Sequence, residues 1–405
     1  MHLNQLVLRN FRNYVDCEID FPGRVNLITG GNAQGKTSLL EAIYFLSTAK
    51  SHRAYPNDEL VRHDENWFYL KGIIAANSDA DDNGAAPAET TLEVSNQLQG
   101  QRRFKLNGDV QPRLSQWLGQ FKVVFFSPES LALVKGAPSD RRRFIDLLLC
   151  QIDAAYLKQL QDYQLVLKQR NELLKQIRGK QANPEQLDAW DSLLVDHGLF
   201  IMQTRSSVLK QLQFYAEEKH AELTGDHERI EILYQASPPL KSLATADQGS
   251  SIATGESLDK SDALVRFRTA LDASRRVDIL YGTTSVGPHR DNFSLVMETR
   301  KQGGILREDA RPYASQGQQR TIALTLKLSE LEVIRHTTGK TPIVLLDDVV
   351  SELDDTRRVF LMDLLGRLNA QTFITSTQRE VLDGQVEDCT VLTVDSGSIL
   401  QREIR

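Results

Sequence analysis

The sequence has little cysteine and no long apolar run. Its 405 residues include three cysteines, Cys17, Cys150 and Cys389, which lie far apart. No metal-ligand spacing and no disulfide framework can be read from them, which fits a reducing cytosol. Arg9 and Arg12 interrupt the N-terminal stretch, so it lacks the core of a signal peptide. No segment approaches the roughly 20 apolar residues of a membrane span, and we expect a cytoplasmic protein.

An excess of positive charge is also missing. The chain carries 48 Lys and Arg against 54 Asp and Glu, a formal net charge of −6. The whole molecule therefore does not attract nucleic acid, and any contact with DNA requires a local basic patch. Hydrophobic residues make up 40% and charged residues 25% of the chain, an ordinary globular composition with length for two or three domains.

A glycine-rich segment near the N-terminus carries a specific chemical signal. Residues 25–29 read as a buried strand, residues 30–37 (GGNAQGKT) match G-x-x-x-x-G-K-[ST], and a helical apolar period follows. Glycines let the backbone curl so that N–H groups point inward, and the helix N-terminus adds its positive end. A plain glycine-rich turn is the alternative, which the strand–loop–helix context disfavours. The segment predicts a nucleotide site.

The predicted nucleotide contacts run from this loop into the helix. Lys36 is expected to reach the β- and γ-phosphates and to act in catalysis, and the Thr37 hydroxyl to ligate Mg²⁺. The cofactor-binding residues of the segment are Gly30, Gly31, Asn32, Ala33, Gln34, Gly35, Lys36, Thr37 and Ser38.

A second segment supplies acids for the same site. Residues 343–346 form a short apolar run, typical of a strand buried on both faces, that ends in Asp347 and Asp348. Such strand ends are where α/β sheets place ligands. We expect Asp347 to hold Mg²⁺, directly or through water, and Asp348 to position or deprotonate the attacking water. A helix cap at Asp348 or Ser351 is the alternative.

Residues 314–324 (ASQGQQRTIAL) concentrate hydrogen-bonding groups ahead of an apolar-periodic helix. Ser315 is a good helix cap, but a cap needs only one side-chain oxygen. The stretch resembles the signature motif of ABC-type ATPases, which in that family binds the γ-phosphate of a nucleotide held by another subunit. The resemblance implies that Ser315 (also catalytic), Gly317 and Gln318 complete the site of a second copy, so that ATP joins a homodimer.

The order of these motifs is that of an ABC-type ATPase head, and residues 351–354 (SELD) resemble its D-loop, which crosses the dimer interface. The implied fold is α/β: a mixed sheet with a P-loop core, an antiparallel β subdomain and an inserted α-helical arm. We expect residues 1–140 to form the N-terminal part of the head, 141–275 the arm, and 276–405 the C-terminal part of the head.

Several longer stretches make the resemblance more specific. They are NFRNY (10–14), KSHR (50–53), FSPESLALVKGAPSDRRRFID (126–146), GPHRDN (287–292) and LLDDVVSELDDTRRVFL (345–361). Together they resemble the RecF family of bacterial recombination and gap-repair proteins over nearly the whole chain. The resemblance implies a nucleoid-associated, ATP-dependent dimer related to SMC-type ATPases. It would bind double-stranded and gapped DNA, help RecO and RecR load RecA, and hydrolyse ATP weakly when stimulated by DNA, with no membrane partner.

The resemblance also places residues outside the phosphate loop. Arg12 and Asn13 would contact the nucleotide. Arg53 would lie near the nucleotide and sense DNA, with an ion pair to Asp58 or Glu59 as its alternative.

Three consecutive arginines, Arg141, Arg142 and Arg143, are the DNA-binding candidates. Like charges so close together favour a polyanion partner, although a solvated helix face with ion pairs is the alternative for any one of them.

Three departures from the wider ABC pattern stand out. Asp348 replaces the usual glutamate and is one methylene shorter, which fits slow turnover. Residues 373–380 (FITSTQRE) offer Thr375, Ser376 and Thr377 where a switch histidine is usual, and no Q-loop glutamine is evident at 124–129.

The remaining sequence predicts the supporting structure. Strands with a hairpin at 107–108 are expected over 67–126 in an antiparallel sheet, and a helical hairpin with its second helix at about 186–223 forms the arm. A helix at 263–273 is expected to return to the head. An acidic stretch (78–89) and a polar stretch (245–262) read as surface connections.

Two other classes share a phosphate loop. The nucleotide-binding subunit of an ABC membrane transporter would need a patch for its membrane partner, and a P-loop kinase would leave the Ser315 stretch unexplained.

Overall fold

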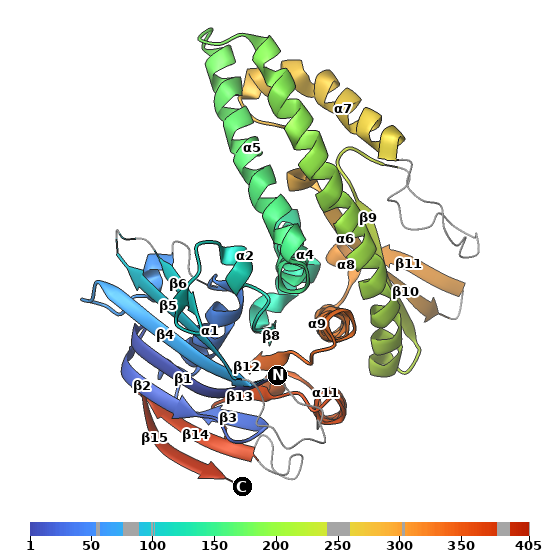
Figure 1. The fold of residues 1–405 in the computed structure, drawn as a ribbon. Coiled ribbons are helices and arrows are strands. Elements are labelled where there is room, and N and C mark those ends of the chain that lie inside the picture. The colour runs from blue at the N-terminus through green and yellow to red at the C-terminus, as the bar shows by residue number, and fades with distance from the viewer. Residues whose placement is uncertain are drawn as a thin grey trace, which may run out of the picture. The chain divides into compact units, whose positions relative to one another are not determined.

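The computed structural model describes residues 1–53, 57–75, 89–98, 100, 102–240, 260–301, 304–378 and 389–404. Within this part of the chain there are two compact units, residues 1–130 with 330–405, and residues 131–329. The first unit joins both ends of the chain, and its blue and red strands pair in Figure 1. The two units are defined by which residues pack together. The predicted division into 1–140, 141–275 and 276–405 is based on sequence motifs and stays a prediction.

A mixed sheet forms the base of the nucleotide site. Its six strands in the described residues have the order β15-β14-β3-β13-β12-β8, with β15 antiparallel at the edge and the others parallel. Their bounds are β3 (Val25–Thr29), β8 (Val123–Phe126), β12 (Ile343–Asp347), β13 (Thr372–Ser376), β14 (Cys389–Asp395) and β15 (Ser398–Ile404). Every residue of β3, β12 and β13 is buried, as their mainly apolar sequences require.

An antiparallel sheet of six described strands completes the first unit, in the order β2-β1-β4-β5-β6-β7. Its strands are β1 (His2–Phe11), β2 (Tyr14–Asp20), β4 (Trp67–Ala75), β5 (Glu89–Gln97), β6 (Arg103–Leu106) and β7 (Asp109–Val110). Asn107 and Gly108 both have positive φ, 52° and 87°, and form the predicted hairpin turn between β6 and β7.

The predicted place of β8 is wrong. It pairs in parallel with β12 in the mixed sheet and not with the antiparallel strands. Its sequence VVFF is buried at every residue, which suits a strand covered on both faces.

Helix α1 (Lys36–Thr48) joins the two sheets into one core. Leu39, Leu40, Ile43 and Phe45 are fully buried, in a cluster that includes residues of both sheets. A helix that is apolar nearly all round is expected between two covering layers. The other helices beginning in this unit are α2 (Leu114–Trp117), α10 (Val349–Glu352) and α11 (Asp355–Arg367).

The second unit contains the helical arm. Its long helices α5 (Ala154–Arg178) and α6 (Leu187–Thr224) pack side by side in opposite directions, which confirms the predicted helical hairpin (Figure 1). Asp153 separates α4 from α5 and caps α5 by accepting a hydrogen bond from Ala155 N. The remaining helices are α3 (Ala132–Lys135), α4 (Pro138–Ile152), α7 (Lys260–Tyr281), α8 (Ala310–Tyr313) and α9 (Gln316–Thr338), which continues into the first unit.

Helix α7 differs from its prediction. It is longer than residues 263–273 and packs along α5 and α6 within the second unit. Phe267 and Leu271, one helical turn apart, are fully buried. Gly198 of α6 admits Phe267, because a Cβ at Gly198 would lie 2.6 Å from the Phe267 ring. The predicted surface connections at 78–89 and 245–262 lie outside the described residues, except for residues 89 and 260–262.

A small antiparallel sheet, absent from the sequence-based expectation, completes the second unit. Among the described residues it has the order β11-β10-β9. The strands are β9 (Glu228–Gln235), β10 (Asn292–Lys301) and β11 (Gly304–Asp309), and α6 packs on β9.

Buried ion pairs hold the arm helices together. Arg170 of α5 has no exposed side-chain surface and contacts Asp191 of α6 at 2.6 Å and Asp278 of α7 at 2.8 Å. Its Nη1 also donates to Thr284 Oγ1 at 2.9 Å. Removing one partner of such a network costs about 3–5 kcal/mol, since an uncompensated charge stays buried.

The GPHRDN stretch forms a second buried contact of the arm. His289 Nε2 donates to Thr284 O at 3.0 Å, so its Nδ1 accepts from the Tyr163 hydroxyl at 2.6 Å. Burial lowers the pKa of His289 from its ordinary value near 6.5 to about 4.

This shift predicts a loss of stability in mild acid. Between pH 6.5 and 4 the unfolded chain binds a proton at His289 and the folded chain does not. The free energy of unfolding should therefore fall as pH drops through this window, by up to about 3 kcal/mol from this residue. Urea unfolding of wild type and His289→Gln from pH 7 to 4 should show a shrinking difference. A constant difference would contradict the assignment; His63→Gln, at a side chain 95% exposed, is the control.

Candidate nucleotide-binding site

The phosphate loop connects β3 to α1 and has an unusual backbone. Gly30, Ala33 and Gly35 all have positive φ, at 149°, 63° and 118°. The glycines are also required by close packing, since a Cβ would lie 2.2 Å from Val394 O at Gly30 and 2.7 Å from Asn13 Nδ2 at Gly35. This curled loop at a helix N-terminus is the expected phosphate cradle.

Lys36 lies within the curve of the loop. Its Nζ donates to Gly30 O and Gly31 O, both at 2.9 Å, and the residue is buried. A β- or γ-phosphate oxygen would replace these carbonyls as a partner of the ammonium group.

Thr37 and Asp347 meet at the end of the mixed sheet. Thr37 Oγ1, in the first turn of α1, donates to Asp347 Oδ1 at the end of β12 at 2.9 Å. A hydroxyl and a carboxylate are the hard oxygen donors that Mg²⁺ prefers. No group of three or more His, Cys, Asp or Glu in the described part of the chain could hold a metal alone. The residues therefore fit a Mg²⁺ whose remaining ligands are water and nucleotide phosphates.

Thr375 of β13 links the two strand acids. Its Oγ1 donates to Asp347 Oδ1 and accepts from Asp348 N, both at 2.9 Å. Of the residues considered in place of a switch histidine, Thr375 makes these contacts, whereas Ser376 Oγ accepts from Gln378 N and Thr377 is exposed. Sequence reasoning named Thr375 without a role.

The environment of the strand acids is typical of a reactive site. Asp348 has a left-handed backbone, φ 55°, a conformation that is costly for a residue other than glycine and clusters at functional sites. Burial raises the pKa of Asp347, while hydrogen bonds from Thr375 and Thr37 act in the opposite direction.

Two turns brace the loop from outside. Asn13 Nδ2 donates to Gln34 O at 2.8 Å and the buried Tyr14 hydroxyl donates to Gly35 O at 3.1 Å. From the β14–β15 turn, Ser396 N donates to Gln34 Oε1 at 2.6 Å. The amide groups of Asn13 and Gln34, predicted as nucleotide contacts, thus bind the protein itself. Of the bracing residues, Tyr14 ends the NFRNY stretch (10–14), and Ser396 carries no local sequence signal.

Arg12 and Arg53 bind the protein as well. Arg12 makes a two-pronged ion pair with Glu41 of α1, at 2.8 and 3.0 Å, and Glu41 is buried. Sequence reasoning missed Glu41 because it lies in an otherwise apolar helix. Arg53 Nε lies 3.5 Å from Glu129 Oε1, with both side chains roughly half exposed. This partner is neither of the two acids considered from sequence.

The signature stretch begins α9 in the second unit. Ser315 N donates to Gln318 Oε1 at 2.8 Å, and Gln318 N donates to Ser315 Oγ at 3.3 Å, a reciprocal capping arrangement. Ser315 and Gly317 are exposed. Apart from its chain neighbours and the backbone of its own helix, the nearest atom to a Cβ built at Gly317 is Ser315 Oγ at 4.0 Å, so this side of Gly317 is open to close approach. For the D-loop, the side chains of Ser351 and Glu352 lie outside the description.

The three arginines proposed for DNA do not form one basic patch. Arg141 is buried, with Nε donating to Asn292 Oδ1 at 2.9 Å and Nη1 to Gly136 O at 3.2 Å. Arg142 Nη1 donates to Asp291 O at 2.7 Å, and Arg143 alone is exposed. The prediction is wrong for Arg141, because its guanidinium is buried against its own chain and presents no surface to a polyanion.

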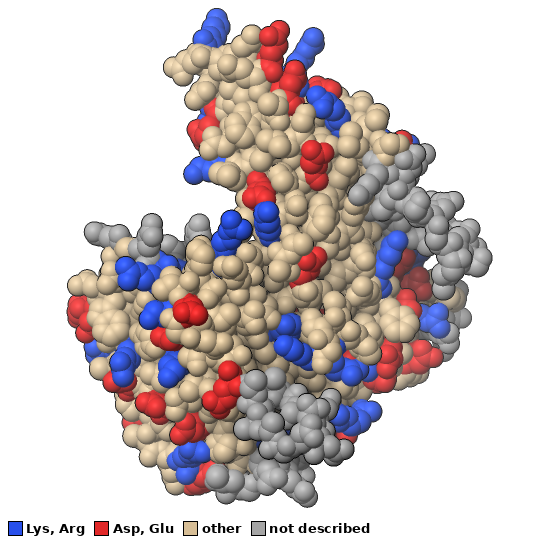
Figure 2. Space-filling view, viewed as in Figure 1, with Lys and Arg blue, Asp and Glu red and all other residues tan. Residues whose placement is uncertain are grey.

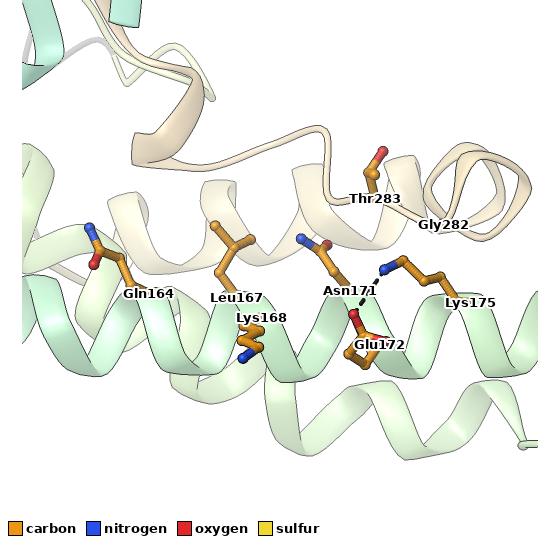
Figure 3. A pocket seen from close by; sticks show the side chains of 8 residues that line it. All are labelled: Gln164, Leu167, Lys168, Asn171, Glu172, Lys175, Gly282 and Thr283. Carbon is orange, nitrogen blue, oxygen red and sulfur yellow. Dashed lines mark hydrogen bonds and ion pairs between the residues drawn. The ribbon is translucent and has the colours of Figure 1, made fainter. Parts of the chain in front are cut away.

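Two surface features bear on other sites. On the face in Figure 2, the described Lys and Arg side chains are interspersed with Asp and Glu, so no large patch of one charge marks a DNA contact there. A hollow of about 290 Å³ lies on the arm between α5 and the turn after α7 (Figure 3). Its lining residues are Gln164, Leu167, Lys168, Asn171, Glu172, Lys175, Gly282 and Thr283. Lys175 donates to Glu172 at 2.8 Å.

The site combines a buried strand, a phosphate loop, a helix and an acid at a strand end, and a helical arm interrupts these elements in the sequence. This combination defines a nucleotide-binding head of the ABC and SMC class. Residues 2–399 match the family model described as the RecF/RecN/SMC N terminal domain. The chain belongs to the RecF family. It is 39% identical over 407 residues to the DNA replication and repair protein RecF of Natranaerobius thermophilus, covering 99% of this chain and 98% of the relative. It is 38% identical to RecF of Streptococcus pneumoniae over 397 residues, 98% of each chain.

Solved structures agree with this assignment. The structure of the recombination mediator protein RecF with ATP has a TM-score of 0.82 and 34% identity, covering 100% of this chain and 97% of that one. The Smc head of Pyrococcus furiosus, at 15% identity and a TM-score of 0.53, shares the fold. The predicted ABC-type α/β head with a helical arm is confirmed. No described helix is both long enough and apolar enough to span a bilayer.

The position of Thr375 predicts a role in metal binding. Thr375→Val removes the hydrogen bonds to Asp347 and Asp348, whereas Thr375→Ser keeps the hydroxyl. Loss of a side chain that orients a metal ligand typically costs about 10- to 100-fold in metal affinity. We expect Thr375→Val to raise by about tenfold the Mg²⁺ concentration that half-saturates binding of a fluorescent ATP analogue. Thr375→Ser and the exposed-site control Thr377→Val should resemble wild type, and an unchanged Thr375→Val would contradict the role.

Proposed function

We propose that this chain is an ATP-dependent DNA-binding protein of recombinational gap repair. The observation that carries the proposal is the division of the motifs: Lys36, Thr37 and Asp347 lie in one compact unit, and the exposed Ser315 and Gly317 begin a helix in the other. In an ABC-type head this division is expected when the signature of one copy completes the site of another.

The site supports slow hydrolysis of ATP to ADP and phosphate. The phosphate loop and Lys36 bind and orient the triphosphate, and Thr37 and Asp347 would hold Mg²⁺. Mg²⁺ bound there would neutralise charge on the β- and γ-phosphate oxygens. Asp348 positions the attacking water, and Ser315 of the second copy donates to the γ-phosphate. The short Asp348 side chain fits a weak ATPase activity that DNA stimulates.

Relatives indicate the biological setting. The matched structures are described as the recombination mediator RecF of the RecFOR pathway, with ATP in one of them. We infer that ATP drives the heads together on double-stranded DNA or gap junctions, that the dimer works with RecR and RecO and assists RecA indirectly, and that hydrolysis releases it. This places the protein at the nucleoid. A transporter subunit or a small kinase is not favoured, because the family match spans residues 2–399.

Dimerisation through the signature stretch is testable with one bulky substitution. Ser315→Arg removes the cap that Gln318 N uses and places a large cation where the phosphate would lie. We expect analytical ultracentrifugation with ATP and Mg²⁺ to show a dimer for wild type and a monomer for Ser315→Arg. Binding of an ATP analogue at low protein concentration should be unchanged. Thr269→Arg, on the exposed face of α7, is the control. Wild-type dimerisation by Ser315→Arg would refute the role.

DNA binding should depend steeply on salt. Each phosphate contact on duplex DNA contributes about −0.9 to the slope of log K against log salt concentration. With ATP, we expect filter binding of gapped duplex to give a clearly negative slope. Arg143→Gln should reduce its magnitude by about 0.9. Arg266→Gln on α7 serves as the control. A flat profile for wild type would favour the transporter or kinase class.

A further inference from the structure

A hydrogen bond from a residue of the signature stretch joins helix α9 to strand β9. Gln318 Nε2 donates to Glu228 Oε1 at 2.7 Å. Glu228 is the first residue of β9, and its side chain is 16% exposed. This hydrogen bond links the signature motif to a residue 90 positions earlier in the sequence.

A buried histidine lies beside the carboxylate of Glu228. His220 Nε2 makes no hydrogen bond in the described residues and lies 3.7 Å from Glu228 Oε2. The other ring nitrogen, Nδ1, lies 3.0 Å from Thr325 Oγ1, two turns along α9 from Gln318. His220 has no exposed side-chain surface and comes from the last turns of α6. The end of the arm helix, the start of β9 and the signature helix therefore meet at Glu228.

The contact has a definite consequence for Gln318. A side-chain amide has one acceptor oxygen and one donor nitrogen, and its orientation is set by its partners. A carboxylate can only accept, so Glu228 fixes Nε2 on its own side. Oε1 is then directed to Ser315 N, where it accepts at 2.8 Å. Without Glu228, Gln318 Nε2 loses the acceptor that fixes the orientation of the amide.

We propose that Glu228, which accepts from Gln318 Nε2, is a positioning residue of the signature motif and sets how well ATP joins two heads. The inference rests on the proposed function, since it assumes that Ser315 meets the nucleotide of a second copy. Glu228 acts through Gln318 and does not touch the nucleotide. Its loss weakens dimerisation and leaves nucleotide binding at the phosphate loop unchanged.

Glu228→Ala tests the proposal. Loss of a hydrogen bond to a charged group corresponds to roughly a tenfold or greater change in an equilibrium constant. We expect ATP-dependent dimerisation, followed by analytical ultracentrifugation over a protein dilution series, to weaken about tenfold. Affinity for a fluorescent ATP analogue should be unchanged. Glu231→Ala is the matched control, because Glu231 lies on the same strand and pairs with Arg307 instead.

A swap of the two side chains separates positioning from general stability. Gln318→Glu places two carboxylates against each other and should weaken dimerisation. Glu228→Gln combined with Gln318→Glu restores a donor and an acceptor in reverse order and should dimerise better than Gln318→Glu alone. The single variant Glu228→Gln keeps an acceptor oxygen and should stay near wild type. These variants decide the question even if Glu228→Ala fails to fold.

The outcomes distinguish the two proposals. If Ser315→Arg dimerises like wild type, the proposed function fails. If Ser315→Arg is monomeric while Glu228→Ala and Gln318→Glu dimerise like wild type, the positioning role of Glu228 alone is overturned. A double variant that dimerises no better than Gln318→Glu, with its thermal unfolding unchanged, would also overturn it.

Discussion

The structure depends on a hydrogen bond that crosses most of the chain. Thr37 Oγ1 and Asp347 Oδ1 are 2.9 Å apart in space and 310 positions apart in sequence. The contact fixes the start of α1 against the end of β12, and Thr375 of β13 holds the same carboxylate oxygen. The phosphate loop, the strand acids and the predicted metal ligands obtain their geometry from this junction, and the turns at Asn13 and Ser396 stiffen it.

The parts that the sequence predicted well are those whose backbone demands particular residues. A curled phosphate loop needs glycine at positions 30 and 35, and the elements β3, α1, β12 and α9 lie where their patterns placed them. Partner choice between strands is not local. The run VVFF of β8 reads as a buried strand without saying which sheet takes it. The β9–β11 sheet mixes charged and apolar residues, and its β9–β10 pairing joins segments more than 50 residues apart.

The same distinction holds within the candidate site. Residue types at Lys36, Thr37 and Asp347 follow from phosphate and metal chemistry, and the structure places them together. The supporting residues Glu41 and Glu228 are recognisable only through partners far along the chain. Arg141 shows the opposite error, since a run of arginines suggests a surface while the fold buries its first member. A local run of charged residues shows only composition. Which of those residues are buried depends on packing against distant parts of the chain.

The joining of the two chain ends has a consequence for synthesis on the ribosome. The neighbours of β3 in the mixed sheet are β13 and β14, which follow it by more than 340 residues. The edges of β3 and the face of α1 that packs on the mixed sheet are therefore covered only after β13 and β14 have been synthesised, whereas residues 131–329 emerge as one continuous unit. Domains form as units during synthesis, and exposed apolar strands are prone to aggregate. The nascent chain must keep β3 unpaired until β13 and β14 arrive, and the strand end that carries Asp347 also joins the phosphate loop late.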